Sequence, residues 1–409
     1  MNSDVSPMPG SGRIYYIAGA GVSGLTLALA LAKFGAAVVV LERTPVLSEF
    51  GAGLQISPNA RHVLNDLGLA ETIAAHSLEP TGIDIYPYRR PGALVTLELG
   101  ATISQQFGAP YAVMHRADLA DALYKACRRF ANIDMLFGVR GWDAVSHARG
   151  VSVTVDEANG QSRNGRAAGL IGADGVHSFT RTKLLNGPEA QYQGRVAWRT
   201  LLPFDAMAGQ VALDRVSVFF APGYHLVCYP LPHRRQVNLA LFAKGPSNKA
   251  DATKPKLPKA LMGSPRLDVI LAAAGDSWTP WPLFTVATPH WHHGNIGLIG
   301  DAAHAMVPFQ AQGAAMGIED AAILAPLLIA SPDAETAFAK FTALRRARVE
   351  RVARISRANG RIFHMEWPFS TARNLVIAAQ GSRAHLKRLA WLYGYDATTA
   401  GRDQSPPTR

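Results

Sequence analysis

The stretch AGAGVSGLTLALALAKFGAAVVVLER, residues 18–43, decides the fold of this 409-residue chain. Its apolar character is compatible with a signal peptide, a membrane span, a buried strand and helix, or a nucleotide-binding turn. The preceding segment, MNSDVSPMPGSG, lacks the basic start of a signal peptide. Lys33 and several glycines interrupt the apolar run, whereas a membrane helix needs about 20 nearly uninterrupted apolar residues. We therefore expect neither a leader nor a membrane span.

The order of elements in this stretch is that of a dinucleotide-binding fold. A short apolar strand over residues 14–18 is followed by a GxGxxG pattern, then by a helical run and a second strand, AAVVVLE. The first glycine, Gly19, permits a tight turn, and Gly21 lets the backbone approach a pyrophosphate. Gly24 lets the helix pack on the strand. The helix N-terminus then turns its unpaired N–H groups toward the phosphate.

An acid closes the second strand. Glu42 stands about 20 residues after the glycines, where a carboxylate accepts hydrogen bonds from ribose hydroxyls. Such an acid disfavours a 2′-phosphate, although the neighbouring Arg43 softens that preference. The whole pattern predicts a nucleotide cradle. It does not separate an NAD dehydrogenase from a flavoprotein.

The net charge of +11 is concentrated in one part of the chain. Twelve Lys or Arg residues and two acids, Glu350 and Glu366, lie between positions 340 and 388, which places +10 of the +11 there. In RRARVERVARISRANGRIF the arginines recur mostly every third residue, so the stripe winds round a helix. We expect a solvated helix face, with attraction of an anionic substrate or nicotinamide phosphate as the functional alternative. Aromatic residues are not interleaved with these cations, so no nucleic-acid partner is expected.

Cysteine and histidine usage predicts no metal site. Cys127 and Cys228 form no CxxC motif, which indicates neither a disulfide framework nor a thiolate site and fits a cytoplasmic protein. The cluster HWHH, residues 290–293, has no carboxylate or thiol partner nearby in sequence. We interpret it as a surface turn.

Two later motifs resolve the flavoprotein question. GLIGADGVHSFTR, residues 169–181, and NIGLIGDAAHAMVPFQAQGAAMGIEDAAIL, residues 295–324, are each an apolar strand that ends in Gly-Ala-Asp or Gly-Asp. Together with the N-terminal glycines they resemble the single-component FAD-dependent aromatic hydroxylases, the p-hydroxybenzoate hydroxylase family. FGAGLQISPNARHVLNDLGL, HRADLADAL and AWRTLLP make the likeness strongest to salicylate and 3-hydroxybenzoate 6-hydroxylase types. The resemblance covers about residues 13–365.

The resemblance implies an α/β fold with a Rossmann-like GR2-type FAD-binding domain, an inserted α+β substrate domain built on an antiparallel sheet, and C-terminal helices. The expected FAD domain is discontinuous, over residues 13–75, 111–186 and 290–332. The expected substrate domain takes residues 76–110 and 187–289, and the helical segment takes 333–400. Residues 1–12 and 401–409 are expected to be tails.

The resemblance also assigns cofactor contacts. Asp301 would bind ribityl hydroxyls, and Gly313-Ala314 would present backbone N–H groups near flavin N1, where a helix N-terminus stabilises negative charge. Asp174 and Arg116 have alternative interpretations, as a turn cap and a surface ion pair. The full set implied for FAD is Gly19, Gly21, Gly24, Glu42, Arg43, Gly53, Arg116, Asp174, Gly175, Gly300, Asp301, Gly313 and Ala314, with Gly51-Ala52-Gly53 passing close to the isoalloxazine.

The segment between the two later motifs alternates like an antiparallel meander and is expected to form the pocket wall. In HLVCYPL the period of two puts His225, Val227 and Tyr229 on one face. A phenol is attacked far more readily as phenolate, so a histidine base is useful there. His225 matches the active-site histidine of the salicylate-type enzymes, with a hydrogen-bonded strand-end histidine as the alternative.

Other candidates surround this base. Tyr229 is assigned to substrate hydrogen bonding or to core packing, and Pro308 matches the family proline near the hydroxylation site. Gln310 and Gln312 are further candidates for polarising the substrate. His304, beside Asp301, is explained equally well by a hydrogen bond to the backbone and is left out of catalysis.

The resemblance therefore implies a monooxygenase that hydroxylates a phenolic aromatic acid with NADH or NADPH and O2, through a C4a-hydroperoxyflavin. One alternative substrate is an N-heteroaromatic such as a hydroxynicotinate. Another class is a flavin oxidase or reductase without hydroxylation, and a third is a noncatalytic nucleotide-binding regulator. The protein is expected to be a monomer or homodimer.

Overall fold

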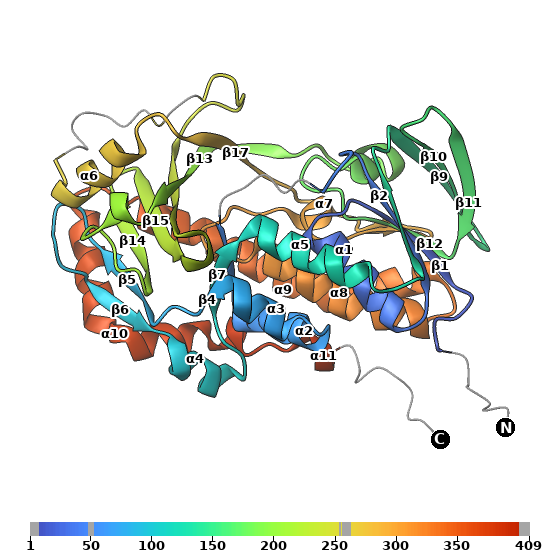
Figure 1. The fold of residues 1–409 in the computed structure, drawn as a ribbon, viewed down its shortest axis with the longest axis horizontal. Helices are drawn as coiled ribbons and strands as arrows, with labels where there is room; N and C mark the ends of the chain where they lie inside the picture. The colour runs from blue at the N-terminus through green and yellow to red at the C-terminus, as the bar shows by residue number, and fades with distance from the viewer. Residues whose placement is uncertain (1–7, 48–52, 253–254, 256–262, 401–409) are drawn as a thin grey trace.

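The computed structural model describes residues 8–47, 53–252, 255 and 263–400. The molecule is elongated, with one sheet toward each end and long helices running between them (Figure 1). The N-terminal half of the sequence supplies most of the sheet at one end, and the middle supplies most of the other.

The first sheet is mainly parallel and contains the strands expected from the opening motif. Its order is β18-β19-β12-β1-β2-β8, and β18 alone runs antiparallel to its neighbour. A three-stranded antiparallel sheet, β11-β10-β9, shares a core with one face of it, and helix α1 covers the other. The bounds are β1 Ile14–Ala18, β2 Ala37–Glu42, β8 Ile133–Phe137, β9 Gly141–His147, β10 Gly150–Asp156, β11 Ser162–Ala167, β12 Gly169–Gly172, β18 His292–His293, β19 Ile296–Leu298 and α1 Val22–Lys33.

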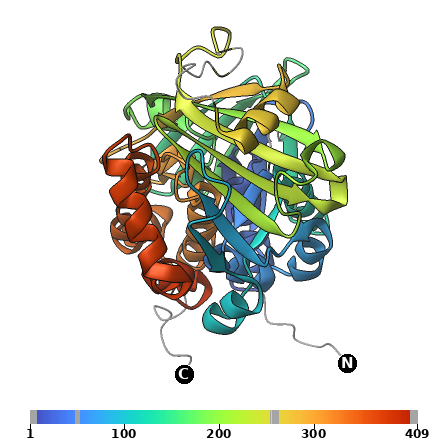
Figure 2. The same ribbon diagram turned by 90° about the vertical axis from the view of Figure 1, so that its left-hand side faces the viewer.

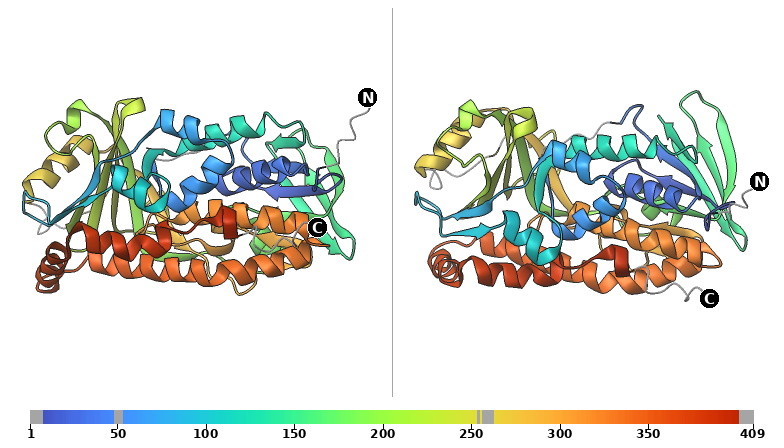
Figure 3. Two further views of the ribbon diagram at one scale, coloured as in Figure 1. Left: turned by 90° about the horizontal axis from the view of Figure 1, so that it is seen from below. Right: turned by 60° about the horizontal axis from the view of Figure 1, so that its bottom comes forward.

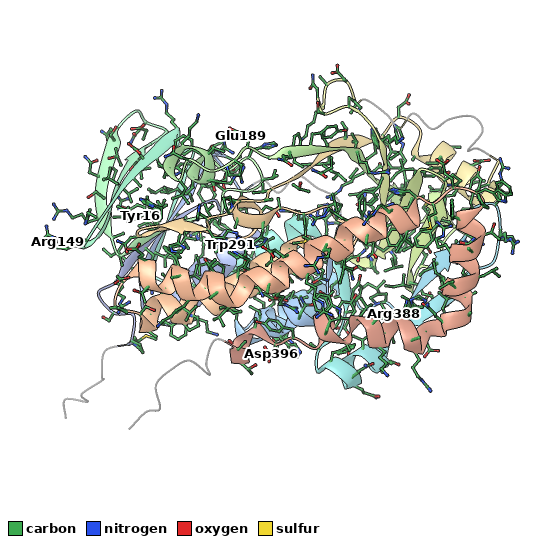
Figure 4. All side chains as sticks on the ribbon, turned by 180° about the vertical axis from the view of Figure 1, so that it is seen from behind. Tyr16, Arg149, Glu189, Trp291, Arg388 and Asp396 are labelled. Atoms are coloured by element: carbon green, nitrogen blue, oxygen red, sulfur yellow. The ribbon has the colours of Figure 1, made fainter. Side chains whose placement is uncertain are left out.

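The cluster HWHH differs from its expected surface turn. His292 and His293 form strand β18, and Trp291 is buried, 5.8 Å from the ring of Phe341 on helix α9 (Ala334–Phe363). Figure 4 labels Trp291 beside this helix. His292 and His293 pair with β19 at the edge of the first sheet, and the Trp291 ring packs into the core. The HWHH cluster is therefore part of the sheet and its core. Among the described residues, no group of His, Cys, Asp and Glu could hold a metal ion.

The second sheet has seven strands in the order β17-β13-β16-β15-β14-β5-β6. It unites strands from residues 82–98 with strands from residues 191–285, the two segments expected to form the substrate domain. The domain boundaries themselves stay a prediction. Figure 2 shows helix α10 (Phe369–Tyr393) along one side of this sheet. The strand bounds are β5 Gly82–Tyr86, β6 Val95–Glu98, β13 Gln191–Pro203, β14 Arg215–Ala221, β15 Tyr224–Leu231, β16 Gln236–Lys244 and β17 Thr279–Thr285.

Helices α8 (Gly313–Ala330) and α9 lie side by side along one face of the molecule (Figure 3). Helix α8 is the one described helix long and apolar enough to cross a membrane, but 72% of it is buried among other elements. It is therefore a core helix, wrapped by α1, α2 and α9.

The remaining elements connect these layers. A small sheet, β3-β7-β4, lies between the two large ones and contacts strand β15 of the seven-stranded sheet. The bounds are β3 Gly53–Ile56, β4 Ser77–Leu78, β7 Ala112–His115, α2 Pro58–Asp66, α3 Ala70–His76, α4 Gly100–Phe107, α5 Arg116–Cys127, α6 Pro265–Ala274, α7 Asp301–His304 and α11 Ala397–Ala400.

The arginine stripe of α9 is only partly solvated, which corrects the expected solvated face. Arg351, Arg354 and Arg357 are exposed, whereas Arg348 is half-buried and Arg345 is completely buried. A three-residue step winds round the helix, so some members of the stripe must face the core. Arg345 tolerates burial because it pairs with two buried acids, Glu319 and Asp320.

Candidate active site

The glycine turn after β1 has the geometry of a nucleotide cradle. Gly19 adopts φ 106°, and a Cβ there would lie 2.5 Å from the carbonyl oxygen of Ala173. A Cβ on Gly24 would collide with the backbone of Gly19, so helix and turn pack together at that point. Gly21 is the N-cap of α1 and makes no side-chain capping hydrogen bond. The first turn of the helix contains no acidic residue. The N–H groups at this helix start are therefore available to an anion.

Glu42 lies at the end of β2, beside this turn. Its carboxylate accepts hydrogen bonds from the backbone N–H of Ala20 at 2.9 Å and from the N–H and hydroxyl of Thr44 at 2.9 and 3.0 Å. These bonds fix the acid next to the cradle while leaving lone pairs for ribose hydroxyls. Arg43 is exposed at the same edge.

A second turn, between β19 and α8, brings Gly300, Asp301 and Gly313 together. Gly300 has φ 57°, and Asp301 begins α7 with an exposed side chain. A Cβ on Gly313 would lie 4.0 Å from Oδ1 of Asp301. Asp301 makes no hydrogen bond to any residue that the structure describes, so it does not act as a turn cap there. Helix α8 starts at Gly313-Ala314 without a side-chain cap and without an acid in its first turn.

Asp174 caps a turn, which is the alternative role considered for it. Its carboxylate accepts hydrogen bonds from the hydroxyl of Ser178 at 2.5 Å and from the N–H and hydroxyl of Thr180 at 2.9 and 3.0 Å. It thereby caps the turn that follows β12. Gly175 adopts φ 79° in that turn. Arg116 is the first residue of α5 and is half-buried.

The small sheet and the seven-stranded sheet, which is antiparallel except for the parallel pair β14–β5, meet at Gly53. Its N–H donates to Oδ1 of Asn238 at 2.7 Å, and the ring of Tyr229 fills the space that a side chain at Gly53 would need. Gly51 and Ala52 lie outside the described residues. Only glycine at position 53 permits this close approach of backbone to the pocket wall.

These residues fit FAD. Two helix starts free of side-chain caps would take the pyrophosphate at α1 and the electron-rich end of the flavin at α8. Glu42 and Asp301 supply carboxylates for ribose and ribityl hydroxyls. The Nδ2 atom of Asn238, beside Gly53, is buried without a hydrogen-bond partner among the described residues, which is consistent with a polar group that completes the site.

One face of the seven-stranded sheet forms the wall of the expected substrate pocket. In β15, His225, Val227 and Tyr229 lie on that face, while Leu226 and Cys228 pack into the core on the other side. The apolar part of the wall meets the loop around Pro308, whose neighbours Val307 and Phe309 belong to the same cluster. That cluster contains Ala197, Ala240, Phe242, Leu283, Val307 and Phe309.

His225 is 1% exposed and is held by aromatic rings. Its ring stacks on Phe242 at 4.6 Å and meets the edges of Phe309 and Phe363 at 5.3 and 5.2 Å. Its Nδ1 atom lies 2.7 Å from Nε2 of His364. Burial, His364 and the Arg195 guanidinium together lower the pKa of His225 well below its usual range.

Tyr229 and Arg199 lie further along the same wall. Burial raises the pKa of Tyr229 above its usual range, with a smaller opposing effect from Arg199. Arg199 stands over the ring of Trp281 at 5.9 Å, and its Nε atom is buried without a hydrogen-bond partner among the described residues. Burial lowers the pKa of Arg199, and Arg116 adds to that effect.

The sequence patterns did not single out Arg199 and His364, which the structure places beside the expected pocket wall. The alternation in AWRTLLP was a usable signal, because Arg199 is two residues from the inward Ala197. His364 had no such signal, since it ends a helix 139 residues away from its partner.

The two glutamines have different surroundings. Gln312 is buried, donates a hydrogen bond to Ser57 at 2.9 Å and accepts one from Asn59 at 3.1 Å. Its side chain therefore binds the start of α2 and not the pocket wall. Gln310 is half-buried and accepts from Asn359.

His304 binds a carboxylate rather than the backbone. Its Nε2 lies 2.6 Å from Oδ2 of Asp320, and the same oxygen accepts from the N–H of Gly300 at 2.9 Å. Arg345 binds Asp320 at 2.8 Å and Glu319 at 2.6 Å. His304 and Arg345 hold the pKa of Asp320 at about 2 despite burial. This buried network fixes the turn that carries Asp301.

A glycine turn at one helix start, a second helix start beside the Asp301 carboxylate and a wall of buried aromatic residues together fit a flavoprotein. The FAD binding domain family model matches residues 14–356. The chain is 31% identical to 3-hydroxybenzoate 6-hydroxylase 1 of Aquipseudomonas alcaligenes, over 92% of this chain and 96% of the relative. It is 30% identical to 6-hydroxynicotinate 3-monooxygenase of Pseudomonas fluorescens, over 84% and 90%.

Solved structures have the same fold. A salicylate hydroxylase substrate complex superposes with a TM-score of 0.76 at 24% identity, covering 97% of this chain and 99% of that one. Klebsiella pneumoniae HpxO, complexed with FAD and uric acid, gives 0.79 at 22% identity, covering 94% and 97%. The chain belongs to the FAD-dependent aromatic hydroxylase family of flavoprotein monooxygenases.

Proposed function

We propose that this protein hydroxylates a phenolic aromatic acid of the hydroxybenzoate or salicylate kind, with NAD(P)H and O2 as co-substrates. The proposal rests on one face of the seven-stranded sheet, where His225, Tyr229 and Arg199 lie beside a cluster of apolar side chains. The 3-hydroxybenzoate 6-hydroxylase relative supports the same class of substrate. The chemistry that FAD supplies when bound is activation of O2 for transfer of one oxygen atom to an aromatic ring.

The register of the wall suggests how the acid lies. Arg199 pairs with Ala240, and Ala240 pairs with Val227, so small apolar side chains separate the arginine from the histidine. His225 lies two residues further along β15. We assign the substrate carboxylate to Arg199, because a half-buried guanidinium that pairs with no acid among the described residues gains from a carboxylate. The phenol then lies toward His225 and the aromatic ring on the apolar floor.

A base at His225 raises the electron density of the ring by taking the phenol proton, which favours attack by an electrophilic oxygen. Such general base catalysis contributes about 10² to 10⁴ in rate. Phe242, Phe309 and Val307 exclude water from this end of the pocket. Exclusion of water prevents loss of activated oxygen as hydrogen peroxide.

The cofactor residues are assigned as the sequence predicts: the α1 turn, Glu42 and Arg43 for the ADP half, and Asp301 with Gly313-Ala314 for the flavin. Asp174 is assigned a structural role in the turn that precedes the substrate domain. We propose a cytoplasmic location, which the two free cysteines support, and a monomeric or homodimeric state. NADH and NADPH are both retained as reductants.

A screen tests the function. Purified protein is expected to be yellow and to oxidise NADH or NADPH faster when 3-hydroxybenzoate, salicylate, 3-amino-4-hydroxybenzoate or 6-hydroxynicotinate is added. Mass spectrometry should find a hydroxylated product for at least one acid. Oxygen consumption that yields only hydrogen peroxide with every acid would favour a flavin oxidase instead.

The second candidate is an N-heteroaromatic acid. The relative named 6-hydroxynicotinate 3-monooxygenase, at 30% identity, favours it. A higher kcat/KM for 6-hydroxynicotinate than for the benzoates in the same screen would select this alternative.

A further inference from the structure

The histidine pair at the end of the pocket wall joins two distant parts of the chain. His225 comes from β15, and His364 is the C-terminal cap of α9. The N–N distance of 2.7 Å is that of a hydrogen bond between two rings. No carboxylate among the described residues hydrogen-bonds to either ring. The pair therefore differs from a histidine oriented by an acid.

The position of His364 is fixed on several sides. The N–H of Gly223, in the turn between β14 and β15, donates to its carbonyl oxygen at 3.2 Å. Arg373 of α10 binds the carbonyl oxygens of Ile362 and Phe363 at 3.1 and 2.9 Å. The ring of Phe309 lies 5.7 Å from the His364 ring. The end of α9 is thereby held against the pocket wall.

The charges that face the pair are cationic. Arg195 of β13 and Arg373 of α10 both act on His364, and Arg195 acts on His225 as well. Phe242 of β16, Phe309 and Phe363 contribute no charge. Burial and the two arginines lower the pKa of His364 to about 3. Both rings are neutral near pH 7, so one must donate to the other.

The tautomers follow from the role of His225. A base that accepts a proton at Nε2 carries its own hydrogen on Nδ1 and donates it to Nε2 of His364. His364 must then carry hydrogen on Nδ1. That atom is buried and has no hydrogen-bond partner among the described residues. An unpartnered buried donor next to a catalytic base calls for an acceptor such as water.

We propose that His364 is a positioning residue that relays the substrate proton away from His225. The inference rests on the proposed function. The phenol O–H bond breaks and its proton bonds to Nε2 of His225, whose Nδ1 proton passes to Nε2 of His364. The Nδ1 proton of His364 passes to a water molecule. The pocket gains a phenolate and no imidazolium, and return of the proton to the product oxygen restores both tautomers.

The experiment compares wild type with His364→Gln in the FAD-bound protein. Glutamine accepts the hydrogen bond from His225 but cannot pass a proton on. The probe is the acid from the screen above that most stimulates NAD(P)H oxidation. Its phenolate absorbance is recorded on binding between pH 6 and 8, and an indicator dye reports proton release. His293→Gln, at an exposed histidine, is the matched control.

Wild type and the control should bind the acid as phenolate and release about one proton near pH 7. In His364→Gln the bound acid should keep its neutral spectrum, and hydroxylation should fall at least about tenfold and recover with rising pH. His364→Gly should regain activity with added imidazole, which a purely structural role would not produce. An unchanged spectrum and pH profile in His364→Gln would overturn the relay alone. Wild type that neither ionises nor hydroxylates any of the acids would overturn the proposed function, and the relay with it.

Discussion

At the scale of single residues, the pocket wall sets its chemistry by burial. His225 is surrounded by three aromatic rings and a second histidine, so its charged form is strongly disfavoured. A base in such surroundings must transfer the proton it accepts to another group, because the protonated imidazolium is disfavoured. Tyr229, whose pKa is raised, stays protonated and is available as a hydrogen-bond donor.

Replacement of the base gives the first prediction. His225→Ala should lower the rate of hydroxylation by about 10² or more, because the phenol is then attacked in its neutral form. FAD absorbance should be unchanged, since the residue lies in the substrate wall. Stopped-flow measurement of product formation checks this, with His293→Ala as the control. A hydroxylation rate equal to that of wild type would remove His225 from the role of base.

Arg199 gives a prediction on binding. Arg199→Met should raise KM for the aromatic acid by about 10- to 100-fold, the equivalent of about 1.5–3 kcal/mol for a lost charged hydrogen bond. The value of kcat should change less. Arg215→Met, on the same sheet but partly exposed and paired with Asp84, should leave KM unchanged. An equal KM for benzoate-type acids and their uncharged amides in wild type would contradict the assignment.

The depressed pKa of His364 predicts how stability depends on pH. The folded pKa of about 3 lies below the ordinary 6.5, so the unfolded chain binds more protons between these values. Stability is fully present above pH 6.5 and falls as pH drops toward 3, by up to about 1.4 kcal/mol per pH unit from this group. Urea unfolding at pH 7 and pH 5 should show a smaller loss in His364→Phe. Equal losses in both proteins would show that His364 is not buried as a neutral ring.

At the scale of elements, a buried ion network ties helices α2, α8 and α9 to the cofactor turn. Asp320 holds the N–H of Gly300, the ring of His304 and the guanidinium of Arg345. Glu319 binds Asn59 of α2 at 2.6 Å and Arg345 at 2.6 Å. Satisfied networks of this kind fix geometry, and here they fix the turn that presents Asp301 and the start of α8.

Breaking this network should be costly. Asp320→Asn leaves Arg345 with a weakened partner and should lower the free energy of unfolding by about 3–5 kcal/mol. Asp333→Asn, at the exposed N-cap of α9, replaces one good capping residue with another and should have little effect. Denaturant unfolding of the FAD-bound protein measures both. A loss below about 1 kcal/mol in Asp320→Asn would show that the network contributes little.

The positions of helices and strands were predicted better than the tertiary contacts of their side chains. Strand β1 covers residues 14–18 (IYYIA), as predicted, and α1 begins at Val22, three residues before the helical run that the sequence predicts from Leu25 to Phe34. Alternation in HLVCYPL correctly separated the two faces of β15, because the period of a strand is independent of its partners. The burial of Arg345 within the arginine stripe, the strand at HWHH and the carboxylate partner of His304 were missed. Each depends on a contact between segments far apart in sequence, which local patterns do not record.

At the scale of the whole molecule, the site exists only because separate segments meet. The glycine turn after β1 and the Asp301 turn belong to one sheet, the pocket wall belongs to another, and His364 comes from the end of α9 (Figures 1 and 3). The long α9 spans both ends and connects the ion network to the histidine pair. We therefore expect FAD binding and aromatic hydroxylation to be properties of the intact chain.

The most direct test of that claim is the fate of molecular oxygen. Purified protein is incubated with NAD(P)H, 18O2 and the acid that most stimulates reductant oxidation, and the product is examined by mass spectrometry. We expect a hydroxylated acid that carries one 18O atom, formed by a protein that retains FAD. Recovery of the label only in hydrogen peroxide, with the acid unchanged, would contradict this expectation.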